Sequence, residues 1–228
     1  EALKKIEVNF KIIDHNSGSD NLNKIKNLFK KNNLKMELLD LDVNKFKEKI
    51  HKMNEEQKQV TLNQMSNMSN IHQSLLESKN SKDLIYFIED DYLHKLNSLE
   101  EMIFTYERIA SQINDELFIC STDYPYLYNK LDSTNIFLGN NYHWRRVDET
   151  LCSFLTSKKM IDKYWGELVS MCEYEHYPFE KPLHNIFKKE LCISPIPTLS
   201  IHCTNINSIY GLSPNINWKK IWDENKID

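Results

Sequence analysis

The stretch LIYFIEDDYLH, residues 84–94, joins an apolar run to three consecutive acidic residues. The run LIYFI predicts a buried strand over 84–88, because β-branched and aromatic residues favour strands. Polar groups at the carboxyl end of a parallel strand lie where such sheets bind their ligands. In an extended chain Glu89 and Asp91 point the same way, on either side of Asp90, so they can share one divalent cation. The alternative interpretation is a solvated turn after a buried strand.

Strands and helices alternate along the first half of the chain. Strand patterns cover 8–14, 34–42 and 116–120, and helical patterns cover 21–31, 44–80 and 98–113. This alternation predicts an α/β fold with a mostly parallel central sheet, Rossmann-like, flanked by helices on both faces.

The second half predicts a small antiparallel portion. Residues 134–147 form two strand-like arms around Gly139, Asn140 and Asn141, which is a hairpin signal, and residues 151–157 add another strand. Helices are expected over about 157–172, 180–190 and the tail 217–224, and two short strands are expected within 192–203, interrupted by Pro195 and Pro197.

Composition excludes several classes of protein. The 228 residues carry 29 basic and 33 acidic side chains, a net charge of −4, which favours no nucleic-acid partner. We find no apolar stretch of the roughly 20 residues that span a bilayer and no secretory signal pattern, so we expect a cytoplasmic protein. Five scattered cysteines argue against disulfides and zinc knuckles. With only four glycines, no Gly-rich phosphate loop is present.

The order of VNFKIIDHNSGSD, NIHQSLLESKNSKDLIYFIEDDYLH and SPIPTLSIHCTN resembles bacterial glycosyltransferases of the GT-A fold, close to their family 2 group. YFIEDDYLH resembles the acidic DXD metal motif of that fold, and the SPIP segment with its histidine resembles a C-terminal block of one bacterial subgroup. The resemblance covers nearly the whole chain. It implies one GT-A domain over 1–228, with a nucleotide-sugar-binding half over about 1–123 and an acceptor-binding half over about 124–228.

The resemblance also implies a set of site residues. Mn²⁺ or Mg²⁺ would be held on the diphosphate of a UDP- or GDP-linked sugar by the predicted metal ligands Glu89, Asp91 and His202. For His202 the alternative is an ordinary strand histidine. The residues implied in donor binding are Asp14, Ser17, Asn70 and Asp90, of which Asp90 would face the sugar hydroxyls.

A catalytic base is implied near the start of a helix beyond the hairpin. Glu180 matches this position, and Asp148 and Glu149 are its rivals. Glu180 can also be read as a first-turn helix acid, and Asp148 as an ion-pair partner of a neighbouring arginine. The segment YHWRR, residues 142–146, is either an acceptor platform or a hairpin with its aromatic residues in the core and its arginines in water.

The function implied is a metal-dependent, inverting glycosyltransferase acting on a saccharide or lipid-linked acceptor in the synthesis of a bacterial surface polysaccharide. A lipid-linked acceptor would bring it to the inner face of the membrane as a peripheral protein. The alternatives are a sugar-nucleotide nucleotidyltransferase and a catalytically silent GT-A binding module. In the family a first strand precedes the segment matching VNFKIID, and here only EALKKIE precedes it. We therefore expect either a trimmed N-terminus or a protein without that strand.

Overall fold

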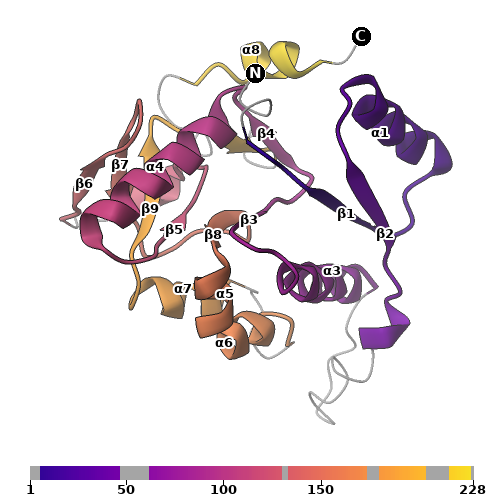
Figure 1. Ribbon diagram of the computed structural model, residues 1–228, viewed down its shortest axis with the longest axis horizontal. Coiled ribbons are helices and arrows are strands. Elements are labelled where there is room, and N and C mark those ends of the chain that lie inside the picture. Colours follow the sequence, from indigo (N-terminus) through magenta and orange to yellow (C-terminus); the bar gives the residue numbers. More distant parts are fainter. Residues whose placement is uncertain (1–5, 47–61, 130–132, 174–179, 204–215, 227–228) are drawn as a thin grey trace.

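The computed structural model describes residues 6–46, 62–129, 133–173, 180–203 and 216–226 (Figure 1). Its elements are β1 (Phe10–Asp14), α1 (Ser19–Lys31), β2 (Met36–Asp40), α3 (Leu62–Ser78), β3 (Leu84–Phe87), β4 (Tyr92–His94), α4 (Ser98–Ile113), β5 (Phe118–Ile119), the 3₁₀ helix η2 (Pro125–Asn129), β6 (Ile136–Leu138), β7 (His143–Arg146), β8 (Phe154–Ser157), α5 (Lys158–Lys163), α6 (Trp165–Ser170), α7 (Lys181–Phe187), β9 (Cys192–Ile196), β10 (Ser200–His202) and α8 (Trp218–Asn225).

The main sheet has six strands in the order β3-β8-β5-β9-β7-β6. Of its five strand pairings, only the one between β5 and β9 is parallel. The expected α/β class with helices on the sheet is confirmed, and the expectation of a mostly parallel sheet is wrong.

The strand β8 accounts for much of this difference. It lies between β3 and β5 and runs antiparallel to both, and all four of its residues are buried. Such a strand, buried on both faces, lacks the alternation of polar and apolar residues that would indicate how it pairs with its neighbours. Its sequence therefore predicted a strand but not the direction in which it pairs.

Helices cover both faces of the sheet (Figure 1). On one face, α4 packs Met102 and Ile109 against Leu155 and neighbouring strand residues. On the other face, α5, α6 and α7 pack against Phe118 and Phe154. Successive residues of a strand point to opposite faces, which is why Phe154 and Leu155 belong to different clusters.

Two smaller sheets stand beside the main one. Strands β1 and β2 pair in parallel, and α3 packs on them through an apolar cluster that includes Ile13, Met65 and Met68. Strands β4 and β10 pair antiparallel and carry α8 through a cluster of Leu93 and neighbouring residues. Within the described ranges, no helix is long and apolar enough to cross a membrane.

Most predicted elements are present, with shifted bounds. The helix expected over 157–172 is divided into α5 and α6 at Tyr164. Strand β9 continues through Pro195, and Pro197 follows a cis peptide bond before β10. Part of the helical region expected over 44–80 lies outside the described residues, which include α3 from its second half.

A buried carboxylate ties the predicted hairpin to α4. Glu101 is 1% exposed, and its two oxygens accept hydrogen bonds from the backbone N–H groups of Asn141 and Tyr142. They also accept from the Asn141 amide, the Thr105 hydroxyl and the indole of Trp144. The turn between β6 and β7 is thus held by a side chain from a helix about 40 residues away.

Candidate functional site

The acidic residues that follow β3 lie in the short connection to β4. Asp90 and Asp91 form a turn, so they do not continue the extended strand. The expectation that Glu89 and Asp91 point the same way in an extended segment is therefore wrong in its geometry. The two carboxylates are still close enough for the charge of Asp91 to raise the pKa of Glu89.

The pairing of β4 with β10 brings His202 to Asp91. Tyr92 stands opposite His202 in this ladder, and the Cys203 N–H donates to the Asp91 carbonyl oxygen over 2.7 Å. His202 Nε2 lies 2.7 Å from Asp91 Oδ2, and the two side chains are 18% and 38% exposed. Two of the three predicted metal ligands, 111 positions apart in the chain, are thus in direct contact.

Aromatic residues hold this pair in place. The Tyr92 ring stacks on His202 with centroids 4.9 Å apart, and the Tyr92 hydroxyl is hydrogen-bonded to that of Tyr124. Tyr124 follows β5 and is 1% exposed. The position of His202 is therefore determined by packed rings as well as by the strand ladder.

Glu89 is held by Ser153, which directly precedes β8. The Glu89 N–H donates to Ser153 Oγ over 3.0 Å, and the Ser153 hydroxyl donates to Glu89 Oε2 over 3.3 Å. The pKa of Glu89 is raised from 4.5 to about 7, chiefly because burial disfavours the charged form. The charges of Asp91, Glu180 and Asp90 act in the same direction. The residue as a whole is exposed, so water screens part of this effect.

The raised pKa of Glu89 predicts a pH-dependent stability. The folded protein binds this proton more tightly than the unfolded chain, so ionisation of Glu89 destabilises the fold. We expect this contribution to stability to be present below pH 4.5, to fall as the pH rises from 4.5 to about 7, and to stay constant above. Urea unfolding of the wild type and of Glu89→Gln across this pH range checks the prediction. The difference between their free energies of unfolding cancels the contribution of other titrating groups, such as His94, that both proteins contain. A difference that does not change with pH would contradict the prediction.

Glu180, at the start of α7, lies near the acidic cluster, which consists of Glu89, Asp90 and Asp91. It occupies the N-cap position, where its side chain makes no capping hydrogen bond, so it is not the first-turn helix acid of the alternative interpretation. Its negative charge raises the pKa of Glu89 and that of Tyr126. The structure thus brings Glu180, a predicted catalytic residue, close to Glu89.

The rival candidates for the base have different positions. Asp148 forms an ion pair with Arg146 over 3.4 Å, and both side chains are exposed, which matches the alternative interpretation. The charge of Glu149, like that of Glu180, raises the pKa of Tyr126.

Three of the predicted donor-binding residues gather at the carboxyl end of β1. Asp14 Oδ2 accepts from the Ser17 N–H over 3.3 Å, and the Asn70 amide donates to the Ile13 carbonyl over 3.2 Å. Among the described residues, no hydrogen bond or ion pair joins this group to the acidic cluster, which holds the fourth, Asp90.

Two residues of the segment YHWRR, Trp144 and Arg145, are buried, whereas His143 and Arg146 are exposed. Trp144 is fully buried, and Arg145 donates from Nε and an Nη to the buried Asp123 over 3.2 and 2.9 Å. The guanidinium also lies 4.1 Å from the ring centroid of Tyr128. The acceptor-platform interpretation is wrong for Trp144 and Arg145, and the expectation of arginines in water holds only for Arg146.

Sequence reasoning missed Ser153 as a site residue, and for the loop of Tyr124 it left open whether the loop lines a sugar pocket or anchors a crossover. Ser153 lies in a predicted strand with no polar signal of its own, and only the pairing of β8 with β3 brings it to Glu89. Tyr124 belongs to the aromatic loop TDYPYLY, whose composition is the one available signal.

The cluster is acidic and partly open to solvent, and Asp91 and His202 are donors of the kind that bind a divalent cation. In the part of the chain that the structure describes, no three His, Cys, Asp or Glu side chains are close enough together to hold a metal ion by themselves. We compared the chain with protein-family models, with curated proteins and with solved structures. None of the three comparisons found a match.

Proposed function

We propose that the chain is a metal-dependent glycosyltransferase that moves a sugar from a UDP- or GDP-linked donor to a saccharide or lipid-linked acceptor in bacterial surface polysaccharide synthesis. The observation that carries the proposal is the contact of Asp91 with His202 at 2.7 Å. It joins the two segments, YFIEDDYLH and SPIPTLSIHC, in which the resemblance to GT-A enzymes is most specific.

The residues at this contact fit a divalent cation. Mg²⁺ and similar ions are commonly bound by one or two carboxylates together with phosphate oxygens and water, so a complete cage of protein ligands is not required. Asp91, Glu180 and Asp90 place negative charge around Glu89, and this repulsion favours a bound cation. When bound there, Mn²⁺ or Mg²⁺ would stabilise the charge that develops on the departing diphosphate.

The other residues would bind and orient the reactants. Asp14, Ser17 and Asn70 form a polar group suited to a nucleoside. Asp90 is the exposed member of the acidic cluster that would accept hydrogen bonds from sugar hydroxyls. Glu180 is the base in this proposal, because its carboxylate is engaged by no capping bond and lies within the electrostatic reach of Glu89. It would remove the proton of the acceptor hydroxyl.

Binding of UDP and GDP tests the proposal. We expect calorimetry to show nucleotide binding that requires Mn²⁺, and we expect Asp91→Ala and His202→Ala each to weaken it at least about tenfold. The matched control is Asp162→Ala, which removes an exposed carboxylate from the surface of α5. Binding that Asp91→Ala leaves unchanged would show that the metal site lies elsewhere.

Other results of this calorimetry, and of an assay for nucleotide-sugar formation, favour the alternative functions. Nucleotide binding without any metal dependence, or none at all, favours a silent binding module. Formation of a nucleotide sugar from a nucleoside triphosphate and a sugar phosphate favours a nucleotidyltransferase.

A further inference from the structure

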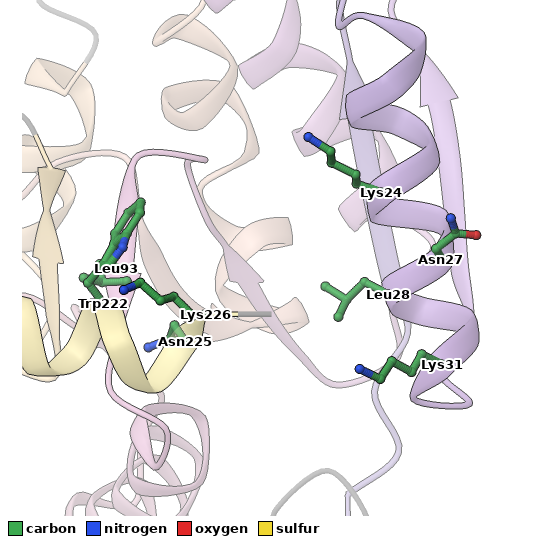
Figure 2. A pocket seen from close by; sticks show the side chains of 8 residues that line it. All are labelled: Lys24, Asn27, Leu28, Lys31, Leu93, Trp222, Asn225 and Lys226. Atoms are coloured by element: carbon green, nitrogen blue, oxygen red, sulfur yellow. The ribbon is translucent and has the colours of Figure 1, made fainter. Parts of the chain in front are cut away.

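A pocket of about 700 Å³ lies between α1, β4 and α8 (Figure 2). Its walls include three lysines, a tryptophan and two leucines: Lys24, Lys31, Lys226, Trp222, Leu28 and Leu93. Figure 2 shows Lys24, Leu28 and Lys31 pointing from α1 across the pocket toward α8. The volume is in the range of small-molecule sites.

This pocket is separate from the acidic site. Adjacent residues of a strand point to opposite faces. In β4, Tyr92 and His94 point toward His202 and Tyr86, whereas Leu93, between them, lines the pocket. The two sites therefore lie on opposite faces of the same strand.

The charges around the pocket are mostly positive. Lys24 and Lys31 are two helical turns apart on one face of α1. Lys226 makes an ion pair with Asp223 over 2.5 Å, which neutralises part of its charge. Among the described residues, Lys24 has no ion-pair partner. An anion entering the pocket would meet two lysines from one side and a third from the other.

The uncharged lining residues are suited to contact with the ring of a ligand. Trp222 is 51% exposed although it is large and apolar, so one face of its indole is available for stacking. Leu28 and Leu93 add apolar surface. The amide nitrogen of Asn225 already donates to the His94 and Ile221 carbonyls, which leaves its oxygen to accept from a ligand hydroxyl.

We propose that this pocket binds a phosphorylated ring compound, a nucleotide or a sugar phosphate, with its ring on Trp222 and its phosphate between Lys24, Lys31 and Lys226. The lysines alone would accept any anion, and the apolar side chains alone would accept any hydrophobic group. The two together select a compact ligand that carries both. The proposal does not rest on the proposed transferase activity, because the acidic site contributes none of the lining residues.

Calorimetry and tryptophan fluorescence test the pocket in buffer that contains EDTA, so that binding at a metal site is suppressed. The probes are UMP, GMP, glucose 1-phosphate and inorganic phosphate. We expect saturable binding of at least one ring-bearing probe, tighter than that of inorganic phosphate and weakened by added salt. Comparison of UMP and GMP with glucose 1-phosphate identifies which class of ring the pocket takes.

Variants on exposed positions assign the binding to this pocket. We expect Trp222→Ala to weaken it about tenfold, and Lys24→Ala or Lys31→Ala at least about threefold each. Lys30→Ala is the matched control, since Lys30 lies on the same helix but does not line the pocket. Asp91→Ala should bind the probes as the wild type does, which separates this test from that of the acidic site. The proposal is wrong if no ring-bearing probe binds, if inorganic phosphate binds as tightly as the others, or if Trp222→Ala and Lys24→Ala bind unchanged.

Discussion

Glu180→Gln is expected to lower turnover about 10²–10⁴-fold, which is the usual contribution of a general base. Gln keeps the size and hydrogen-bonding capacity of Glu but cannot take a proton from an acceptor hydroxyl. Glu180 lies at the start of α7, where its side chain makes no capping hydrogen bond and its charge raises the pKa of Glu89. The measurement is the release of UDP or GDP from the donor sugar in the presence of acceptor.

Two further measurements make this prediction specific. Metal-dependent nucleotide binding by Glu180→Gln should remain within about threefold of the wild type, because a base acts on the acceptor and not on the donor diphosphate. Asp148→Asn serves as the matched control, since Asp148 is paired with Arg146 at the surface. Unchanged turnover in Glu180→Gln together with its loss in Asp148→Asn would transfer the role to Asp148.

Glu101→Ala is expected to reduce the free energy of unfolding by about 3–5 kcal/mol. The carboxylate is 1% exposed and accepts hydrogen bonds from five groups of α4 and the β6–β7 hairpin. Its removal leaves buried donors, including the Trp144 indole and the Thr105 hydroxyl, without an acceptor, and water cannot easily replace it. Chemical unfolding followed by circular dichroism measures the loss.

Neighbouring variants show whether the loss comes from these hydrogen bonds. Glu101→Gln keeps one acceptor oxygen and should cost less, about 1–3 kcal/mol. Glu107→Ala, on the exposed side of the same helix, should change stability by no more than about 0.5 kcal/mol. If Glu101→Ala were no less stable than Glu107→Ala, the carboxylate would not be what holds the hairpin.

The elements that the sequence predicted well are those with a strong local signal. Helix α4 was expected over 98–113 and occupies Ser98–Ile113, since its apolar residues recur at helical spacing and acidic residues fill its first turn. The hairpin around Gly139 is present for a similar reason, because turn residues separate two apolar arms. No local pattern in the sequence indicated the direction of β8 or the break between α5 and α6.

In the candidate site, too, some residues were recognisable from the local sequence, whereas their contacts depended on the tertiary structure. Local chemistry singled out Glu89 to Asp91, because three acids after an apolar run are unusual whatever surrounds them. The contact of His202 with Asp91 depends on β10 pairing with β4 in one register, and that of Ser153 with Glu89 on β8 pairing with β3. Trp144 and Arg145 had the composition of a sugar-binding surface, and packing placed them in the core instead.

The sequence by itself determined the α/β class, most helices and strands, and the acidic segment that follows β3, since each depends on neighbouring residues of one short stretch. Only the tertiary structure decided the direction of β8, the partner of Asp91, the closeness of Glu180 to Glu89 and the pocket between α1 and α8. Each of these joins segments far apart in the chain. Their positions depend on strand pairing and on the shared burial of apolar faces, which local periodicity does not encode.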